Sequence, residues 1–204
     1  MTVALIDYGA GNLFSVRNAL AAAGAADVIV TDRAEDVLAA DRIVLPGVGA
    51  FAACAGALFA IPGMREALDD AVLGRGRPFL GVCVGMQLMA AWGEEGERTA
   101  GLGWIGGTVR AMPAGPSIRV PHMGWNLVRP AGEGCEPIAA GEAYFLHGYA
   151  LDPDDPMDVL ATTDHGGPVV AAVRTGPALG VQFHPEKSQR YGLDLLARFL
   201  DWRP

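Results

Sequence analysis

The stretch that decides the fold of this 204-residue chain is Gly81-Val82-Cys83-Val84-Gly85-Met86-Gln87-Leu88. The short apolar run before it, Pro78 to Leu80, predicts a buried parallel strand. The residues from Met86 to Trp92 are good helix formers without glycine or proline and predict a helix. A Gly-x-Cys-x-Gly pattern at a strand-to-helix junction is the arrangement of a nucleophile elbow, with cysteine in place of serine.

Such an elbow makes Cys83 a candidate nucleophile. Its neighbours must be small, because the nucleophile sits in a strained backbone where strand and helix approach each other. The sulfur then lies at a helix N-terminus, whose positive dipole end favours the thiolate over the thiol. The backbone N–H of Val84 is free to bind an oxyanion. The alternative interpretation is a buried structural cysteine flanked by turn glycines.

A nucleophile needs a base, and a second stretch offers one: Gly180-Val181-Gln182-Phe183-His184-Pro185-Glu186-Lys187-Ser188. Pro185 favours an extended conformation at His184, so we expect His184 and Glu186 to point to the same side. A carboxylate beside an imidazole fixes its tautomer and supports the imidazolium, as in a catalytic triad. Alone, this pattern also fits a solvated strand end. Together with the elbow it predicts a catalytic site.

These two stretches resemble those of the class I (triad) glutamine amidotransferases. The resemblance runs from residue 7 to residue 188, and within the family it is closest to the glutaminase subunits that supply a cyclase of histidine biosynthesis. The further segments that carry it are Asp7-Tyr8-Gly9-Ala10-Gly11-Asn12, Leu45-Pro46-Gly47-Val48-Gly49-Ala50-Phe51, Pro121-His122-Met123-Gly124-Trp125-Asn126 and Tyr144-Phe145-Leu146-His147-Gly148-Tyr149.

The resemblance implies a reaction and roles for the residues in it. Cys83 would attack the side-chain amide of L-glutamine and form a thioester, with His184 and Glu186 completing the triad. The N–H groups of Val84 and Val48 would hold the oxyanion. The implied substrate-binding residues are Gly47, Gly49, Gln87, Gly148 and Tyr149. The family usually has serine or threonine where Gly148 stands, so only a backbone role carries over there.

The resemblance also implies a partner and no cofactor. The ammonia would pass to a cyclase subunit, a (β/α)₈ barrel on a separate chain, which forms a heterodimer with this one. That subunit would make imidazole glycerol phosphate and an aminoimidazole carboxamide ribotide. The implied interface residues are Asn12, Met123, Trp125, Asn126 and Lys187.

Composition predicts one globular domain over residues 1–204, with 51% hydrophobic and 19% charged residues. No apolar run reaches the ~18 residues of a membrane span, and the N-terminus has no basic region of a secretory signal. Three widely spaced cysteines (Cys54, Cys83 and Cys135) indicate reduced thiols rather than a disulfide framework or a metal site, so we expect a cytoplasmic protein. The net charge of −8 argues against a nucleic-acid-binding protein.

The hydrophobic pattern predicts an α/β fold of the flavodoxin-like kind. Strands alternate with helices through residue 92, which predicts a mostly parallel central sheet flanked by helices. Beyond Gly93, short strands predict some antiparallel pairing before a closing helix, Gln189 to Trp202. One of these strands is predicted at Ile118 to Val120, and surface loops are predicted at Gly93 to Gly101 and Asp152 to Asp158.

Two other functions remain open at this stage. One is a glutaminase subunit of another class I synthase, of the pyridoxal phosphate or anthranilate type. The other is a non-catalytic flavodoxin-like binding module. Within the site, His122 and His147 are alternative bases, although neither precedes a carboxylate as His184 does, and a structural role suits both better.

Overall fold

The structure, a computed structural model, describes residues 1–115 and 118–204. Its centre is a nine-stranded sheet in the order β2-β1-β3-β4-β13-β12-β11-β8-β9. The first five strands in that order run parallel: β2 (Asp27–Thr31), β1 (Thr2–Ile6), β3 (Arg42–Gly47), β4 (Phe79–Cys83) and β13 (Ala178–Val181). The other four pair antiparallel: β12 (Pro168–Thr175), β11 (Val159–Asp164), β8 (His122–Pro130) and β9 (Gly141–His147). The predicted α/β fold is confirmed.

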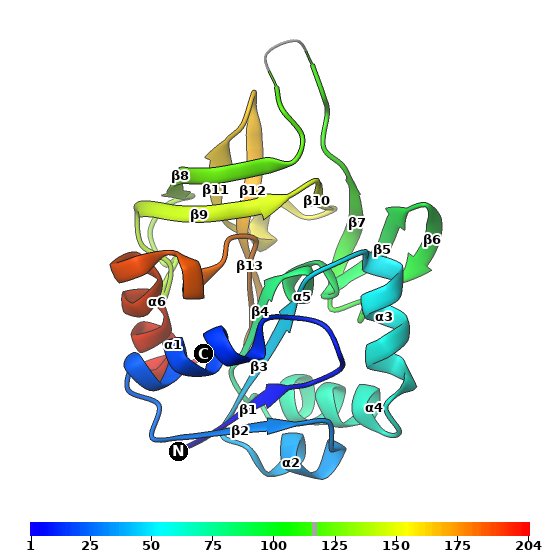
Figure 1. The fold of residues 1–204 in the computed structure, drawn as a ribbon, viewed down its shortest axis with the longest axis vertical. Coiled ribbons are helices and arrows are strands. Elements are labelled where there is room, and N and C mark those ends of the chain that lie inside the picture. The colour runs from blue at the N-terminus through cyan, green and yellow to red at the C-terminus, as the bar shows by residue number, and fades with distance from the viewer. Residues whose placement is uncertain (116–117) are drawn as a thin grey trace.

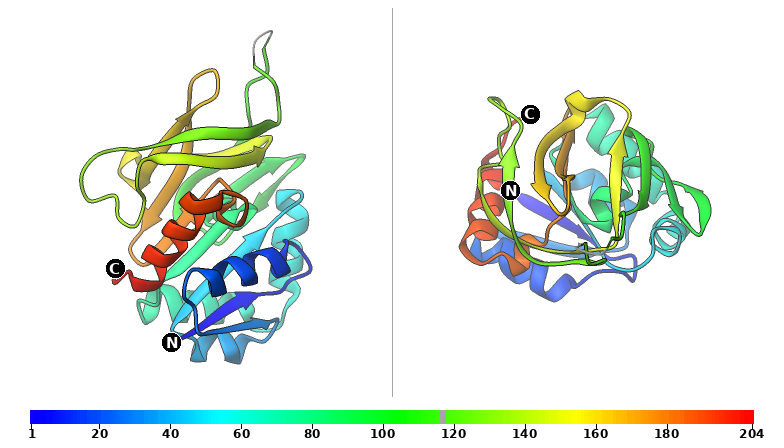
Figure 2. Two further views of the ribbon diagram at one scale, coloured as in Figure 1. Left: turned by 60° about the vertical axis from the view of Figure 1, so that its left-hand side comes forward. Right: turned by 90° about the horizontal axis from the view of Figure 1, so that it is seen from above.

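Helices cover the parallel half of this sheet. On one face, α1 (Leu13–Ala22) lies beside α6 (Gln189–Asp201) (Figure 2). The other helices, shown in Figure 1, are α2 (Ala34–Ala39), α3 (Phe51–Ala60), α4 (Met64–Leu68) and the short α5 (Val84–Gln87) after β4. Helix α4 continues as a π-helical turn, Asp69–Gly74. Every residue of β3 and β4 is buried, as expected of parallel strands covered on both faces, and Arg42 at the start of β3 is their one charged residue.

A smaller four-stranded sheet lies beside the large one, in the order β10-β7-β5-β6. Its strands are β10 (Tyr149–Pro153), β7 (Ile105–Ala111), β5 (Ala90–Glu95) and β6 (Glu97–Ala100). Short 3₁₀ turns lie at Pro156–Asp158, before β11, and at Pro185–Lys187, before α6. Among the described residues, no single helix is long and apolar enough to span a membrane. The pair Phe51–Ala60 and Met64–Gly74 meets that test only when joined, and it is bent by 94°.

The predicted helix from Met86 to Trp92 is wrong. Helix α5 spans only Val84–Gln87, and β5 begins at Ala90. The N–H of Leu102 donates to the Leu88 carbonyl at 2.7 Å, which draws the chain after α5 into the smaller sheet. Strand pairing with residues far along the sequence thus overrides the local helix propensity.

Two further expectations need correction. The segment Gly93 to Gly101, predicted as a loop, belongs mostly to the β5–β6 hairpin, with Trp92 paired to Ala100. The strand predicted at Ile118 to Val120 is absent, since Ile118 forms only an isolated bridge to Gly115 and neither Arg119 nor Val120 is in a strand.

Candidate active site

The predicted elbow is present at the junction of β4 and α5. Cys83 has φ 55° and ψ −111°, a left-handed conformation that costs a non-glycine residue about 1–3 kcal/mol. The flanking glycines are required by space. A Cβ on Gly81 would lie 2.6 Å from the Gly85 carbonyl oxygen, and one on Gly85 would overlap the Leu45 carbonyl of β3. The strained backbone therefore depends on close contact between strand and helix.

The predicted base and its carboxylate are in contact. The Nδ1 of His184 lies 2.9 Å from Oε1 of Glu186, and both side chains are buried. The contact forms because His184 is extended (φ −101°, ψ 99°) and Glu186 lies in the 3₁₀ turn that follows. Two backbone bonds hold His184 in place: its N–H donates to the Tyr144 carbonyl at 2.9 Å, and the Ser188 hydroxyl donates to its carbonyl at 2.7 Å.

The surroundings of His184 favour its protonated form. Burial lowers the pKa of His184, but hydrogen bonds to Cys83 and Glu186 raise it by more, to about 9. At neutral pH the imidazole is therefore protonated, and it faces Cys83 as a cation. A thiolate beside an imidazolium held by a carboxylate is the resting state that a cysteine nucleophile needs.

These groups open into a cavity of about 330 Å³, large enough for an amino acid. It brings together eight of the residues predicted for catalysis and substrate binding, and Lys187, which was predicted for the partner interface: Val48, Gly49, Cys83, Val84, Gln87, Gly148, Tyr149, His184 and Lys187. The cavity wall does not include Gly47 or Glu186. Gly47 directly precedes Val48 in the chain, and Glu186 follows His184 by two residues. Three lining residues were not predicted for the site, namely Glu95, Pro121 and Leu146, and His147, considered above as an alternative base, lines it as well.

The end of β3 and Val48, the residue after it, are held from one side by two donors. The Tyr8 hydroxyl donates to the Pro46 carbonyl at 2.7 Å, and the Cys54 thiol donates to the Val48 carbonyl at 3.5 Å. Burial raises the pKa of Tyr8, which keeps this hydroxyl protonated. Alternate carbonyls of an extended chain point to opposite sides. We infer from this alternation that the Gly47 carbonyl points toward β4, where Gly47 pairs with Cys83, and that the Val48 N–H turns away from the sulfur.

Neither alternative base has a free nitrogen. The Nδ1 of His147 lies 2.9 Å from the Tyr149 carbonyl, which can only accept, so this nitrogen carries the proton. Its Nε2 accepts from Nδ1 of His122 at 3.1 Å, and the Nε2 of His122 lies 3.1 Å from the Asn126 amide nitrogen. Burial lowers the pKa of both histidines to about 4. They are neutral and structural, as we expected.

Gln182 is a site residue that the sequence analysis did not single out. It is fully buried, and its amide nitrogen lies 3.6 Å from the Cys83 sulfur. A signal was available in the sequence: Gln182 lies two residues before His184, and alternate residues of an extended chain share a side.

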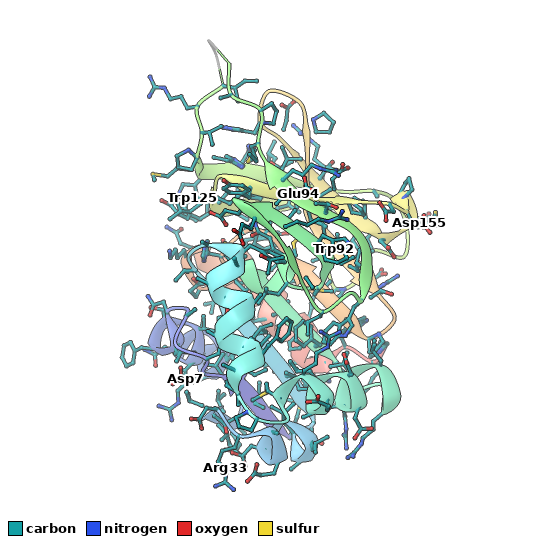
Figure 3. All side chains as sticks on the ribbon, turned by 90° about the vertical axis from the view of Figure 1, so that its right-hand side faces the viewer. Asp7, Arg33, Trp92, Glu94, Trp125 and Asp155 are labelled. Carbon is teal, nitrogen blue, oxygen red and sulfur yellow. The ribbon has the colours of Figure 1, made fainter. Side chains whose placement is uncertain are left out.

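The residues predicted for a partner interface differ in their surroundings. Met123 and Trp125 are exposed, by 62% and 47%. Trp125 is labelled in Figure 3. Lys187 lies at the edge of the cavity. Asn126 instead has its amide nitrogen on His122 and on the Asp164 carbonyl, and Asn12 caps α1 by accepting from the Ser15 N–H at 3.2 Å.

We expect Gly47→Ala to disable the elbow. The new Cβ would lie 2.7 Å from the Gly85 nitrogen and 2.9 Å from Cβ of Val84, so β3 must move away from α5, at a cost of about 1–3 kcal/mol. The temperature of thermal unfolding and the rate of Cys83 labelling should both fall. Gly56→Ala is the matched control, because it meets open space within α3 and should stabilise the helix by about 0.5–1 kcal/mol. If the two variants had the same unfolding temperature and the same rate of Cys83 labelling, close contact at Gly47 would not be what maintains the elbow.

Comparison with known proteins identifies the family of this site. The sequence matches the profile described as "Glutamine amidotransferase class-I" over residues 4–201. The chain belongs to the class I glutamine amidotransferases. Solved structures agree with the fold of this family. One titled "Crystal structure of glutamine amidotransferase" has a TM-score of 0.76 at 18% identity, covering 98% of this chain and 97% of that one. Another, "Structure of PurLQS from Thermotoga maritima", has a TM-score of 0.73 at 17% identity, with coverage of 98% and 97%.

Much closer relatives of this amidotransferase are known from sequence. It is 60% identical to the "Imidazole glycerol phosphate synthase subunit HisH" of Zymomonas mobilis, over all of this chain and 97% of that protein. The protein of the same name from Rhodospirillum rubrum is 51% identical over the full length of both chains.

Proposed function

We propose that this chain is the glutaminase subunit of an imidazole glycerol phosphate synthase, with Cys83, His184 and Glu186 as its catalytic triad. The observation that carries the chemistry is the left-handed Cys83 facing the buried His184–Glu186 pair across one cavity. The full-length identity to proteins named HisH supports this synthase over one of the pyridoxal phosphate or anthranilate type.

The geometry supports a two-step hydrolysis. The Cys83 thiolate attacks the δ-carbonyl carbon of glutamine, and His184 donates its proton to the departing nitrogen, which leaves as ammonia. His184 then takes a proton from water as the water attacks the thioester, and glutamate is released with the thiolate restored. Glu186 holds the imidazolium in orientation throughout, at 2.9 Å.

Substrate binding falls to the walls of the cavity. The amide nitrogen of Gln87 is already engaged with the Tyr149 carbonyl and the Gln182 side chain, both at 3.0 Å. Its oxygen is left to accept from the ammonium group of glutamine. The backbone of Gly49, Gly148 and Tyr149 surrounds the rest of the substrate, and Gly47, outside the cavity wall, acts through the peptide that it forms with Val48. A Cβ at Gly148 would meet Val120 at an ordinary 3.5 Å, so serine would fit there as well.

The oxyanion hole needs a rearrangement. Val84 N–H is one donor, and the second is Val48 N–H, which the extended strand turns away from Cys83. Rotation of the Gly47–Val48 peptide would bring this N–H to the oxyanion. The flexibility of Gly47 and Gly49 permits such a rotation, and Gly49 already has φ 113°.

The partner is a cyclase subunit, a (β/α)₈ barrel, with which the chain forms a heterodimer in the cytoplasm. An exposed apolar stripe supports a docking surface on β8: Met123, Trp125 and Leu127 alternate along the strand and are 62%, 47% and 43% exposed. Asn12, Asn126 and Lys187 complete the proposed interface. Ammonia needs a protected path from the cavity to this partner, because in bulk water it would be protonated and lost.

The test is glutamate formation by the purified chain with and without the cyclase. We expect the isolated chain to be slower by roughly 10²–10³-fold, the effect of one missing oxyanion donor. The two chains should also co-purify. Full turnover by the isolated chain would contradict the required peptide rotation, and failure to react with a glutamine-analogue electrophile such as diazo-oxo-norleucine would favour a non-catalytic binding module.

A further inference from the structure

The Cys83 sulfur has two polar neighbours besides His184: the Leu146 carbonyl, to which the thiol donates at 3.9 Å, and the Gln182 side chain. Gln182, which follows β13, has no exposed surface and places its Nε2 3.6 Å from Sγ of Cys83. Its backbone N–H donates to the Ala171 carbonyl at 2.9 Å, so main-chain pairing holds this residue in place. A fully buried amide is costly unless each end finds a partner. The partners at its two ends therefore indicate what the side chain does.

The hydrogen-bond network allows only one orientation of this amide. The Tyr149 carbonyl can only accept, so the end of Gln87 that lies 3.0 Å from it must be the NH₂ group. The other proton of that group points to Oε1 of Gln182, also at 3.0 Å. The remaining end of Gln182, which faces the sulfur, is therefore its NH₂ group.

The Tyr149 carbonyl is held from a second direction as well. Nδ1 of His147 lies 2.9 Å from it and donates. His147 is in turn held by His122, whose Nδ1 lies 3.1 Å from its Nε2. The Tyr149 carbonyl thus accepts from both His147 and Gln87, and one hydrogen-bond network connects His122 on β8, through this carbonyl, with Gln182 and Cys83.

We propose that Gln182 is a further catalytic residue: its side-chain N–H donates to the Cys83 sulfur and stabilises the thiolate. A thiolate accepts hydrogen bonds far better than a thiol, so a fixed donor at this place favours the charged form. With His184, the sulfur then has two donors rather than one. The same amide joins the nucleophile, through Gln87, to the Tyr149 turn that the substrate would contact.

This proposal rests on the thiolate chemistry proposed for Cys83, but it is tested separately from glutamine turnover. The measurement is the rate of Cys83 alkylation by iodoacetamide between pH 5 and pH 10, quantified on the Cys83 peptide by mass spectrometry so that Cys54 and Cys135 do not contribute. The first test variant is Gln182→Glu, which keeps an oxygen for Gln87 and replaces the donor that faces the sulfur by a negatively charged oxygen. The second is Gln182→Met, which removes the donor without adding a charge.

We expect Gln182→Glu to be alkylated about tenfold or more slowly at pH 7, because hydrogen bonds to charged groups contribute that much to an equilibrium. Near pH 10 its rate should approach that of the wild type, so the half-maximal rate moves to higher pH. Gln189→Glu makes the same chemical change at an exposed position and should leave the profile unchanged. Gln182→Met, of similar volume but without a donor, should show the same upward shift if the glutamate variant does not fold.

Three outcomes separate the hypotheses. A pH profile that coincides with the wild type, or a rate that is reduced equally at every pH, would overturn the role of Gln182. An upward shift in both Gln182 variants supports it. If wild-type protein with the cyclase forms no glutamate, the proposed function fails, whatever the alkylation profile shows.

Discussion

Replacing Cys83 with alanine is expected to reduce glutamate formation by at least about 10⁴-fold in the presence of the cyclase. The loss of a nucleophile removes the covalent route entirely, and what remains is the much smaller contribution of binding and of the oxyanion donors. The assay is glutamate production at saturating glutamine. Cys135→Ala is the matched control, since Cys135 is also a buried free cysteine but does not line the cavity, and it should keep nearly full activity.

The strain at this position permits a second, independent measurement. Glycine usually lowers stability relative to alanine by about 0.5–1 kcal/mol, because it has more freedom in the unfolded chain. At φ 55° and ψ −111° the order should change, so Cys83→Gly is expected to be at least as stable as Cys83→Ala in thermal unfolding, while both are inactive. A glycine variant clearly less stable than the alanine variant would contradict the assignment of strain to the elbow.

The elbow and the base could be predicted because the requirements behind them are local. Two glycines around Cys83 are needed for space at one turn, and His184 and Glu186 are only two residues apart. The alternation of apolar runs and helical segments likewise predicted the parallel half of the sheet. The wrong helix from Met86 to Trp92 shows the limit of this reasoning, because hydrogen bonds from Leu102 and Ile105 to Leu88 and Met89 decide that segment.

The residues that the sequence did not reveal act through contacts between distant parts of the chain. Tyr8 holds the Pro46 carbonyl of the strand next to the elbow, 38 positions away in the sequence. Gln182 reaches Cys83 across 99 positions. No spacing rule connects such pairs. The orientation of the Gly47–Val48 peptide is hidden for the same reason, since it depends on which donors lie on each side of the strand.

Replacing Glu186 with glutamine is expected to slow glutamate formation by roughly 10²–10⁴-fold and to change its pH dependence. His184 must carry a proton to give it to the departing ammonia. Since its pKa is raised to about 9, the proton is present at neutral pH and is lost as the pH rises through about 9. The wild-type rate should therefore fall above that pH. Burial lowers the pKa of His184, and Glu186 is one of the two groups that offset this effect.

Without the carboxylate, the alkaline decline should begin at lower pH. The measurement is the maximal rate of glutamate formation, with the cyclase bound, from pH 6 to pH 10.5. Glutamate is measured because the protonation of free ammonia does not affect it. Glu97→Gln, an exposed change on β6, is the control and should keep the wild-type profile. An alkaline limb that stays at the same pH in Glu186→Gln would mean that Glu186 does not sustain the charge on His184, and the triad would lose its third member.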